Sequence, residues 1–431
     1  MANRMIYLYV TPFFPSRRSW RGAYCYDFVK SFCRVSGDNA KIVVFSEGDG
    51  RDYDFLGVRV YTFVGRRLPS NVFPMLYARK NRKSFLEKVK EVSEREGWSL
   101  SDIAICHAHT ANYGIYALAI KSLNPSAMTV LHHHCLSSFG LNMGMLRHCW
   151  LYNMIQFPIL RRMHEEMDCH VFISEACRKS FLAAPDASWS VYGEYKRQMR
   201  WLPYRPVRIK NSIILHNGVD KSVFNVEESS GEGREERLSR KPFVIGCVGN
   251  FQVLKDQITL LRAVKLICDG TVSAPIRVAA KDAVFKIRFV GSGDELPACR
   301  RFAVEKGIAA EFLPEVRHQE LPRFYRTCDL FVLPSYFEGF GCVYTESLAC
   351  GVPFIACEGQ GIEDVLPEKC RGRWLFHPRD AFQLANKILN YYLHPSEQSL
   401  VEDQDIDKQV IGFLEKLGFV HCTSNGTKDA S

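Results

Sequence analysis

Residues 329–351 read DLFVLPSYFEGFGCVYTESLACG, and this stretch decides the fold class. The apolar run from Asp329 to Pro334 predicts a buried strand, and the spacing of apolar residues from Cys342 to Cys350 predicts a helix. Glu338 then lies on the strand-to-helix loop, and Glu346 lies just over one turn into the helix. Because ligands bind beyond the carboxyl ends of the strands in an open α/β sheet, both acids can face one pocket.

The same segment resembles a known family. Pro334-Ser-Tyr-Phe-Glu338-Gly-Phe-Gly341 and Glu346-Ser-Leu-Ala-Cys-Gly351-Val-Pro353 are similar to the E-x7-E signature of family 4, the retaining glycosyltransferases with the GT-B fold. Without that context, a tight turn with two solvated acids is the simpler interpretation. The resemblance implies that Glu338, a catalytic candidate, holds hydroxyls of the donor sugar and that Glu346 holds the nucleotide ribose. It also implies that the backbone amides of Gly339, Phe340 and Gly341 bind the donor sugar.

Two series of strands separated by helical patterns run along the chain, and the polar segment 226–241 lies between them. We therefore predict an α/β protein of the GT-B type, with two Rossmann-like, doubly wound domains facing a cleft. The predicted parts are an acceptor-binding domain over 1–220, a linker over 221–241, a nucleotide-sugar-binding domain over 242–400, and a short helix with a polar tail over 401–431. The predicted strands are Met5 to Val10, Lys41 to Phe45, Val58 to Phe63, Ile103 to His107, Met128 to His132, Cys169 to Ile173, Ser212 to Leu215, Phe243 to Val248, Lys286 to Val290, Ala310 to Leu313, Leu330 to Leu333 and Val352 to Ala356.

The composition fits a globular protein, with 47% hydrophobic and 24% charged residues among 431. The 16 cysteines show no metal-binding spacing and no signal peptide precedes them, so we expect reduced thiols in a cytoplasmic protein. The net charge of +9 fits nucleic acid, anionic lipid or phosphorylated ligands, and the total alone does not choose among them. We expect no nucleic-acid partner. The segment from Leu146 to Arg162 fits a helix on the cytoplasmic membrane surface and a core helix equally well.

A candidate binding loop for the diphosphate of a nucleotide-sugar donor follows the strand that ends at Val248. Lys255 lies beside the start of a predicted helix near Gln257, where anions are favoured. A lone lysine there is more often a surface residue. The stretch Gly249 to Lys255 resembles the phosphate-gripping loop of family 4, which makes Lys255 a catalytic and donor-binding candidate. Asn250 stands where many members have Arg, so a second phosphate contact would come from elsewhere.

Two other patterns bear on cofactors. Gly291-Ser-Gly293 lacks the third glycine of a dinucleotide fingerprint, which argues against an NAD enzyme. In the resembling family the glycine matching Gly291 lies at the base of the cleft, and Gly291 and Ser335 are secondary site candidates. The D-x-D pairs at Asp52 and Asp54 and at 403–407 are predicted to be solvated acids. We therefore expect no metal and no cofactor, with a nucleoside-diphosphate-sugar as substrate.

Histidines end two neighbouring strands of the first series, in His107-Ala-His109 and His132-His-His134. Consecutive residues of a strand point to opposite faces, so the triplet cannot easily hold one zinc ion. His134 resembles the cleft histidine of family 4 at the donor sugar and is a catalytic candidate, and His109 resembles a secondary one. Gly22 resembles the glycine of the first loop that approaches the diphosphate.

Together with the resemblance, these features predict a metal-independent glycosyltransferase, and the resemblance implies that it retains the anomeric configuration. Its acceptor would be a saccharide or a lipid-linked saccharide in capsule, O-antigen or exopolysaccharide biosynthesis. The alternatives are a GT-B-fold epimerase or phosphorylase, and a non-catalytic nucleotide-sugar-binding protein. Beyond Pro395 the sequence shows no aromatic helix of the kind that closes back on the first domain in the resembling family.

Overall fold

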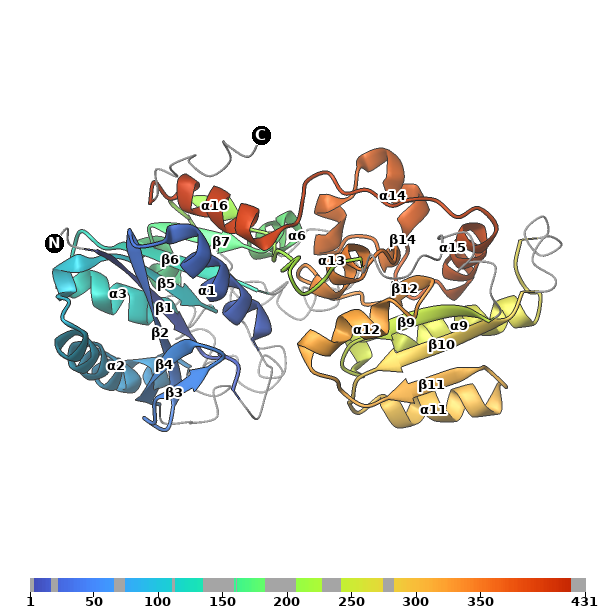
Figure 1. Cartoon of the computed structure of the whole chain (residues 1–431), viewed down its shortest axis with the longest axis horizontal. Helices are drawn as coiled ribbons and strands as arrows, with labels where there is room; N and C mark the ends of the chain where they lie inside the picture. The colour runs from blue at the N-terminus through green and yellow to red at the C-terminus, as the bar shows by residue number, and fades with distance from the viewer. Residues whose placement is uncertain are drawn as a thin grey trace, which may run out of the picture. The chain divides into compact units, whose positions relative to one another are not determined.

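The computed structural model describes residues 4–16, 22–65, 74–110, 113–134, 159, 161–182, 207–226, 242–273 and 283–419. Contacts divide the chain into two compact units. The first unit combines residues 1–217 with 406–431, and the second unit spans 218–405. Each unit has a central β-sheet with helices packed on it (Figure 1). The α/β class and two-sheet organisation predicted from the sequence are confirmed.

The sheet of the first unit has the strand order β3-β4-β2-β1-β5-β6-β7-β8. Neighbouring strands are parallel except for the β3–β4 pair, which is antiparallel. All seven predicted strands are present because buried parallel strands are nearly continuous apolar runs. The three-residue strand β3 was not predicted. The strands are β1 Met5–Thr11, β2 Ala40–Gly48, β3 Tyr53–Phe55, β4 Val58–Val64, β5 Ile103–His109, β6 Met128–His133, β7 Cys169–Phe172 and β8 Ser212–Ile214.

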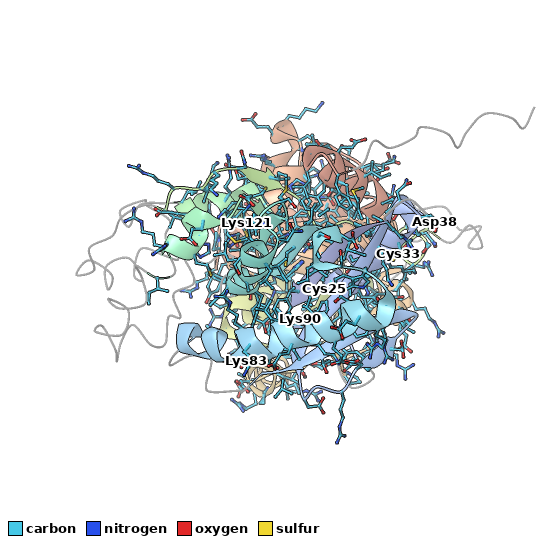
Figure 2. The ribbon with its side chains drawn as sticks, turned by 90° about the vertical axis from the view of Figure 1, so that its left-hand side faces the viewer. Cys25, Cys33, Asp38, Lys83, Lys90 and Lys121 are labelled. Carbon is cyan, nitrogen blue, oxygen red and sulfur yellow. The ribbon has the colours of Figure 1, made fainter. Side chains whose placement is uncertain are left out.

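Amphipathic helices cover this sheet. In α2, Phe85 and Val89 are fully buried, whereas Lys83 and Lys90 lie on the outer side (Figure 2). This four-residue spacing places apolar side chains on one helical face and cations on the other. The helices of the first unit are α1 Ala23–Ser36, α2 Pro74–Glu96, η1 Leu100–Asp102, α3 Gly114–Leu123, α6 Glu175–Leu182 and α16 Ile406–Lys416.

Helix α16 packs against α1, although the two are separated by most of the sequence (Figure 1). The rings of Phe413 and Phe28 lie 6.0 Å apart in an edge-to-face arrangement. Arg34 and Asp407 form an ion pair of 2.6 Å. The sequence analysis predicted a short helix here but found no aromatic helix that closes back on the first domain, and this was wrong, because α16 carries Phe413 onto α1. Residues near the end of the chain thus complete the hydrophobic core of the first unit.

The sheet of the second unit is parallel throughout, with the order β11-β10-β9-β12-β13-β14. All five predicted strands are present, and the two-residue strand β14 was not predicted. The strands are β9 Phe243–Val248, β10 Phe285–Val290, β11 Ala310–Leu313, β12 Leu330–Leu333, β13 Phe354–Cys357 and β14 Leu375–Phe376. The helices are η3 Val253–Lys255, α9 Gln257–Cys268, α11 Leu296–Glu305, η4 His318–Glu320, α12 Leu321–Tyr325, α13 Cys342–Ala349, η5 Gly361–Val365, α14 Glu368–Trp374 and α15 Ala381–Leu393.

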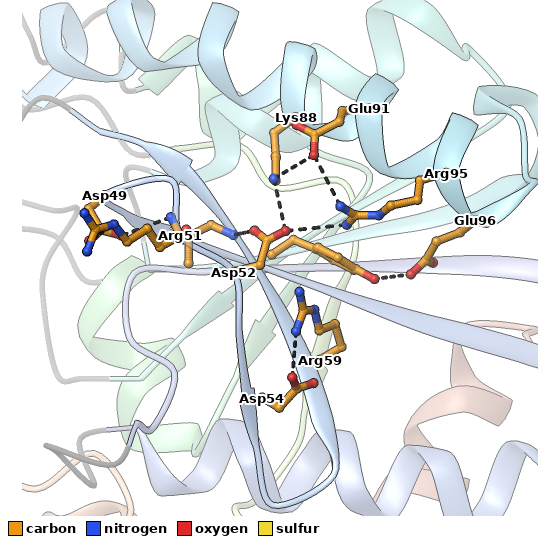
Figure 3. Close-up of polar contacts among 11 residues, drawn as sticks. Asp49, Arg51, Asp52, Asp54, Arg59, Lys88, Glu91, Arg95 and Glu96 are labelled. Atoms are coloured by element: carbon orange, nitrogen blue, oxygen red, sulfur yellow. Dashed lines mark hydrogen bonds and ion pairs between the residues drawn. The ribbon is translucent and has the colours of Figure 1, made fainter.

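The first D-x-D pair belongs to a polar network at the edge of the first sheet (Figure 3). Asp52 is only 10% exposed and forms ion pairs with Lys88 at 3.1 Å and Arg95 at 3.5 Å, both from α2. Asp54 is 65% exposed and pairs with Arg59 at 2.6 Å. The prediction of a solvated acid is therefore wrong for Asp52, which joins helix α2 to the β3–β4 hairpin.

Two of the acids at 403–407, Asp403 and Asp407, also form ion pairs, although their side chains are still 37% and 36% exposed. Asp403 forms an ion pair of 2.6 Å with Lys221 in the second unit. Every cysteine in the described ranges is a free thiol in this structure. No helix among the described residues is both long and apolar enough to cross a membrane. The segment interpreted as a surface or core helix, 146–162, lies outside the described residues except at 159, 161 and 162.

Candidate functional site

Three loops of the second unit lie side by side where β9, β10 and β12 end. Gly291 has a φ of 143°, and a Cβ added there would lie 2.2 Å from the carbonyl oxygen of Gly249. Ser335 donates its hydroxyl to the carbonyl of Leu254 at 3.2 Å, and the backbone N–H of Tyr336 donates to the same carbonyl at 3.2 Å. The close approach at Gly291 requires glycine. The structure thus brings together the strand ends that the sequence predicted would form a site.

Lys255 and Glu338 are in direct contact. The Lys255 ammonium forms an ion pair with the Glu338 carboxylate, although 83 residues separate them. Their side chains are 23% and 16% exposed, so the pair is only partly accessible to water. The backbone N–H of Glu338 donates to the side-chain carbonyl of Gln360 at 2.7 Å, which fixes the loop. A cation and an anion therefore lie together beyond the strand ends, where a ligand that carries a negative group and a hydroxyl could bind both of them in place of their contact with each other.

The Gly-Phe-Gly turn leads directly into α13, as predicted. Gly341 precedes the helix with a φ of 86°, and a Cβ there would lie 2.5 Å from the Tyr344 ring. That ring is held in place because its hydroxyl donates to the carbonyl of Leu333 at 2.7 Å. Phe340 is 1% exposed, and Gly339 is also buried. The turn is therefore anchored by its own side chains and places the first N–H groups of α13 at the loop.

Glu346 lies on α13 as predicted, but it is 5% exposed and already bonded within the second unit. Its Oε1 is 2.9 Å from His318 Nε2, and its Oε2 accepts a hydrogen bond of 3.0 Å from the Tyr325 hydroxyl. Burial, followed by the nearby Glu346 charge, raises the pKa of Tyr325 well above its usual value, so this hydroxyl stays a donor. The sequence analysis missed both partners because a single His and a single Tyr form no motif.

Two residues beside the loops have backbones that favour glycine. Asp256, just before α9, has a φ of 49°, and Arg379 has a φ of 66°. Arg379 lies over the Tyr336 ring at 4.5 Å and donates to its hydroxyl at 2.8 Å. Such conformations cost free energy and often occur at functional sites. Arg379 is a cation near the loops that no motif indicated.

Asn250 has an exposed side chain, and its backbone carbonyl accepts a hydrogen bond of 3.0 Å from the side-chain amide of Gln257.

The predicted residues of the first unit lie near one another. His109 Nδ1 is 2.6 Å from His134 Nε2, and the ring of Tyr24 is 4.4 Å from the His134 ring. Gly22 comes directly before α1, two residues ahead of that tyrosine. Burial lowers the pKa of His134 to about 3. His134 is therefore neutral near pH 7 and can act there as a hydrogen-bonding group but not as a cation.

A second group of histidines consists of His133 on β6, His170 on β7 and His164. His133 Nε2 is 3.0 Å from His170 Nδ1, and His170 Nε2 is 3.0 Å from the carbonyl oxygen of His164. All three side chains are at most 5% exposed. Side chains alternate between the faces of a strand, so the triplet at 132–134 is divided as the sequence predicted.

Acid should destabilise the first unit through this second group of histidines. Burial lowers the pKa of His170 to about 4 and the pKa of His164 well below the ordinary 6.5. Between pH 6.5 and 4 the unfolded chain therefore binds more protons than the folded chain, so stability falls as the pH falls. We expect these two residues together to lower the free energy of unfolding by about 2 kcal/mol as the pH falls from 6.5 to 5.5.

Urea unfolding at both pH values would measure this loss. In His170→Gln the dependence of the unfolding free energy on pH should be smaller by about 1 kcal/mol over that interval. His394→Gln, at an exposed position of the second unit, is the control and should keep the wild-type dependence. An unchanged dependence in His170→Gln would contradict the prediction.

Comparisons with known proteins agree with this geometry. The sequence model of the family described as "Glycosyl transferases group 1" matches residues 242–394, which include the three loops. The chain is 26% identical to the sulfoquinovosyl transferase SQD2 of Arabidopsis thaliana over 373 residues, covering 85% of this chain and 62% of that protein. It is 33% identical over 170 residues to a D-inositol 3-phosphate glycosyltransferase of Mycobacteroides abscessus, covering 39% of this chain and 35% of that one. The chain thus spans less than two thirds of these relatives.

Solved structures share the fold over nearly the whole chain. HepE of Anabaena, solved with UDP and glucose, superimposes with a TM-score of 0.61 at 16% identity, covering 97% of this chain and 100% of that one. A sucrose-phosphate synthase from Thermosynechococcus elongatus gives a TM-score of 0.58 at 16% identity, covering 96% and 95%. The protein therefore has the GT-B fold, and residues 242–394 of its second unit match the group 1 glycosyl transferase family.

Proposed function

We propose that this protein is a retaining glycosyltransferase that moves a sugar from a nucleoside-diphosphate-sugar to an acceptor hydroxyl. The observation that carries the proposal is the ion pair between Lys255 and Glu338. The two residues come from separate loops that meet at the strand ends, inside the segment that matches the family. The fold it shares with structures described as bound to UDP, glucose or UDP-glucose supports this type of donor.

Donor binding would open the ion pair between Lys255 and Glu338. The diphosphate of the donor would pair with the Lys255 ammonium, and a hydroxyl of its sugar would donate a hydrogen bond to the Glu338 carboxylate. The amides of Gly339 to Gly341 and the start of α13 would face the same sugar. Each charge of the pair thereby receives a new partner, so opening the pair leaves no charge unsatisfied.

Cleavage of the donor bond places negative charge on the departing diphosphate and positive character on the sugar. A lysine held beside the diphosphate stabilises the leaving group in the transition state, so the reaction we propose needs no metal ion. Glu338 fixes the sugar through its hydroxyls while the bond breaks. Asn250, Gly291 and Ser335 would shape the loops around the donor.

Glu346 would accept a hydrogen bond from a ribose hydroxyl on a lone pair that its contacts with His318 and Tyr325 do not use. A carboxylate has about four acceptor positions, and His318 and Tyr325 use two of them. The two partners would also keep the carboxylate in one orientation. In the first unit, His134 would donate a hydrogen bond as a neutral ring, with His109 behind it and Gly22 near the diphosphate.

For the acceptor, we propose a saccharide or lipid-linked saccharide used in cell-surface polysaccharide synthesis, reached at the cytoplasmic face of a membrane. The excess of basic residues supports contact with such a surface or with a phosphorylated acceptor. A phosphorylated polyol is a second acceptor class to test, since a relative is named for D-inositol 3-phosphate.

A screen of UDP-sugars and GDP-sugars with the full chain tests the proposal. Release of the nucleotide should depend on an acceptor, and NMR of the product should show the donor's anomeric configuration retained. Interconversion of the sugar would instead indicate an epimerase, and dependence on inorganic phosphate would indicate a phosphorylase. Binding of donors without turnover, across saccharide, lipid-linked and phosphorylated acceptors, would indicate a non-catalytic binding protein.

A further inference from the structure

Three histidines of the first unit converge on one face of its sheet. His107 and His109 are two residues apart on β5, and His132 lies on β6 directly beside His109 in the parallel register. Their side chains are 0%, 1% and 3% exposed. Imidazole nitrogens of the three lie within 4.8 Å of one another. Neighbouring strands thus bring three ligand-type side chains to one buried point.

The hydrogen bonds of this group are incomplete. His107 uses Nδ1 in a contact of 2.7 Å with the Tyr7 hydroxyl, and His109 uses Nδ1 in the contact of 2.6 Å with His134. Within the described residues, His107 Nε2, His109 Nε2 and both ring nitrogens of His132 have no hydrogen-bond partner. A buried polar atom without a partner costs about 1–3 kcal/mol, and such atoms in native proteins often mark a missing water or ion.

The pattern of used and unused nitrogens is the one that a metal site needs. A histidine that binds a metal through one nitrogen usually gives its other N–H to an orienting group. Tyr7 and His134 are such groups for His107 and His109, which leaves the Nε2 of each without a hydrogen-bond partner among the described residues. Burial lowers the pKa of all three histidines, so the rings are neutral and able to bind a cation.

The other buried group differs in this respect. His133 and His170 bond each other, and His170 also contacts the His164 carbonyl. The ring nitrogens of these three histidines also lie within 4.8 Å of one another, but both nitrogens of His170 are used in these contacts, so this ring has none left for a metal ion. The second group therefore serves as a matched control of the same residue type, burial and sheet.

We propose that His107, His109 and His132 form a binding site for a divalent transition-metal ion of the zinc type in the core of the first unit. Imidazole ligands suit Zn²⁺, Co²⁺ and Ni²⁺, and three of them leave one coordination position for water. In a tetrahedral site with Zn–N bonds of about 2.0–2.1 Å the nitrogens are about 3.4 Å apart, so the rings close inward on binding. The ion would satisfy the unpaired nitrogens and join β5 to β6. The sequence analysis expected no metal because the spacing of the cysteines, the consecutive histidine triplet and the D-x-D pairs did not indicate one, and it did not combine histidines from two strands.

Metal binding to the full chain tests this site. The chain would be stripped with a chelator and dialysed against Zn²⁺ or Co²⁺, and bound metal would be counted by mass spectrometry. We expect one ion per chain, a melting temperature that rises with metal, and Co²⁺ absorption bands without a thiolate charge-transfer band. The background variant Cys33→Ser with Cys268→Ser removes two exposed thiols that could bind metal independently.

His132→Gln is the decisive variant because His132 makes no hydrogen bond that the substitution would break among the described residues. It should bind no ion under these conditions, whereas the control His170→Gln should bind one ion as the wild type does. If His132→Gln does not fold, Tyr7→Phe decides, with an expected loss of affinity of about tenfold. Absence of metal in the wild type, equal binding in His132→Gln, an unchanged affinity in Tyr7→Phe, or a purely thiolate cobalt spectrum would overturn the proposal.

Discussion

Replacing Glu338 with Gln should lower the rate of sugar transfer by about a hundredfold or more while the second unit stays folded. The substitution keeps the volume and the loop contact through the backbone, but it removes the charge that faces Lys255 and accepts from the sugar. Losing one preorganised electrostatic contact typically costs 10²–10³ in rate, or about 2.7–4 kcal/mol. Lys255→Met should show a loss of similar size, because the diphosphate then leaves without a neighbouring cation.

Kinetics with a saturating donor would measure both effects, and the double variant would measure their coupling. Because each residue is the partner of the other, the double variant should lose less than the product of the two single losses. The matched control is another lysine–glutamate pair of the second unit, Lys286 and Glu311 at 2.8 Å, which lies on β10 and β11. Glu311→Gln should keep the wild-type rate. Wild-type turnover in Glu338→Gln or Lys255→Met would refute the proposed role of that residue.

Replacing Phe413 with Ala should destabilise the first unit by about 3–5 kcal/mol, the usual cost of removing a buried aromatic ring. Phe413 is 1% exposed, and its ring contacts those of Phe28 on α1 and His107 on β5. The cavity would lie between helix and sheet, where the backbone of both is fixed by other contacts and cannot collapse fully.

Hydrogen exchange of β1 under increasing urea would report on the first unit separately from the second. Phe382→Ala is the control, because that ring is 49% exposed on α15, and it should change stability by no more than about 0.5 kcal/mol. A loss below about 1 kcal/mol in Phe413→Ala would mean that α16 contributes little to the core of the first unit.

Most of the fold could be predicted because parallel strands are buried on both faces and form apolar runs in the sequence. Strands β3 and β14 were missed because three and two residues are too short for such a run. The packing of α16 was missed for another reason. Its apolar positions at Ile406, Val410 and Phe413 predict a helix with one apolar face, but nothing local indicates that the face packs on α1.

Only part of the candidate site could be predicted from the sequence. The approach of Lys255 to Glu338 could be anticipated because both follow strands of one parallel sheet, whose carboxyl ends share an edge. The partners of Glu346 could not be anticipated, because His318 and Tyr325 become significant only when α12 and α13 pack together. The role of each donor-binding residue stays a prediction until the variants are measured.

The return of α16 to α1 affects how the molecule is made on the ribosome. The first unit is interrupted by the second, and its core includes Ile406, Leu414 and Phe419, which are synthesised after the whole second unit. A nascent chain that ends before these residues exposes the apolar surface of α1 that they would cover. The inserted unit can therefore fold cotranslationally first, and the N-terminal unit matures only when α16 has left the exit tunnel.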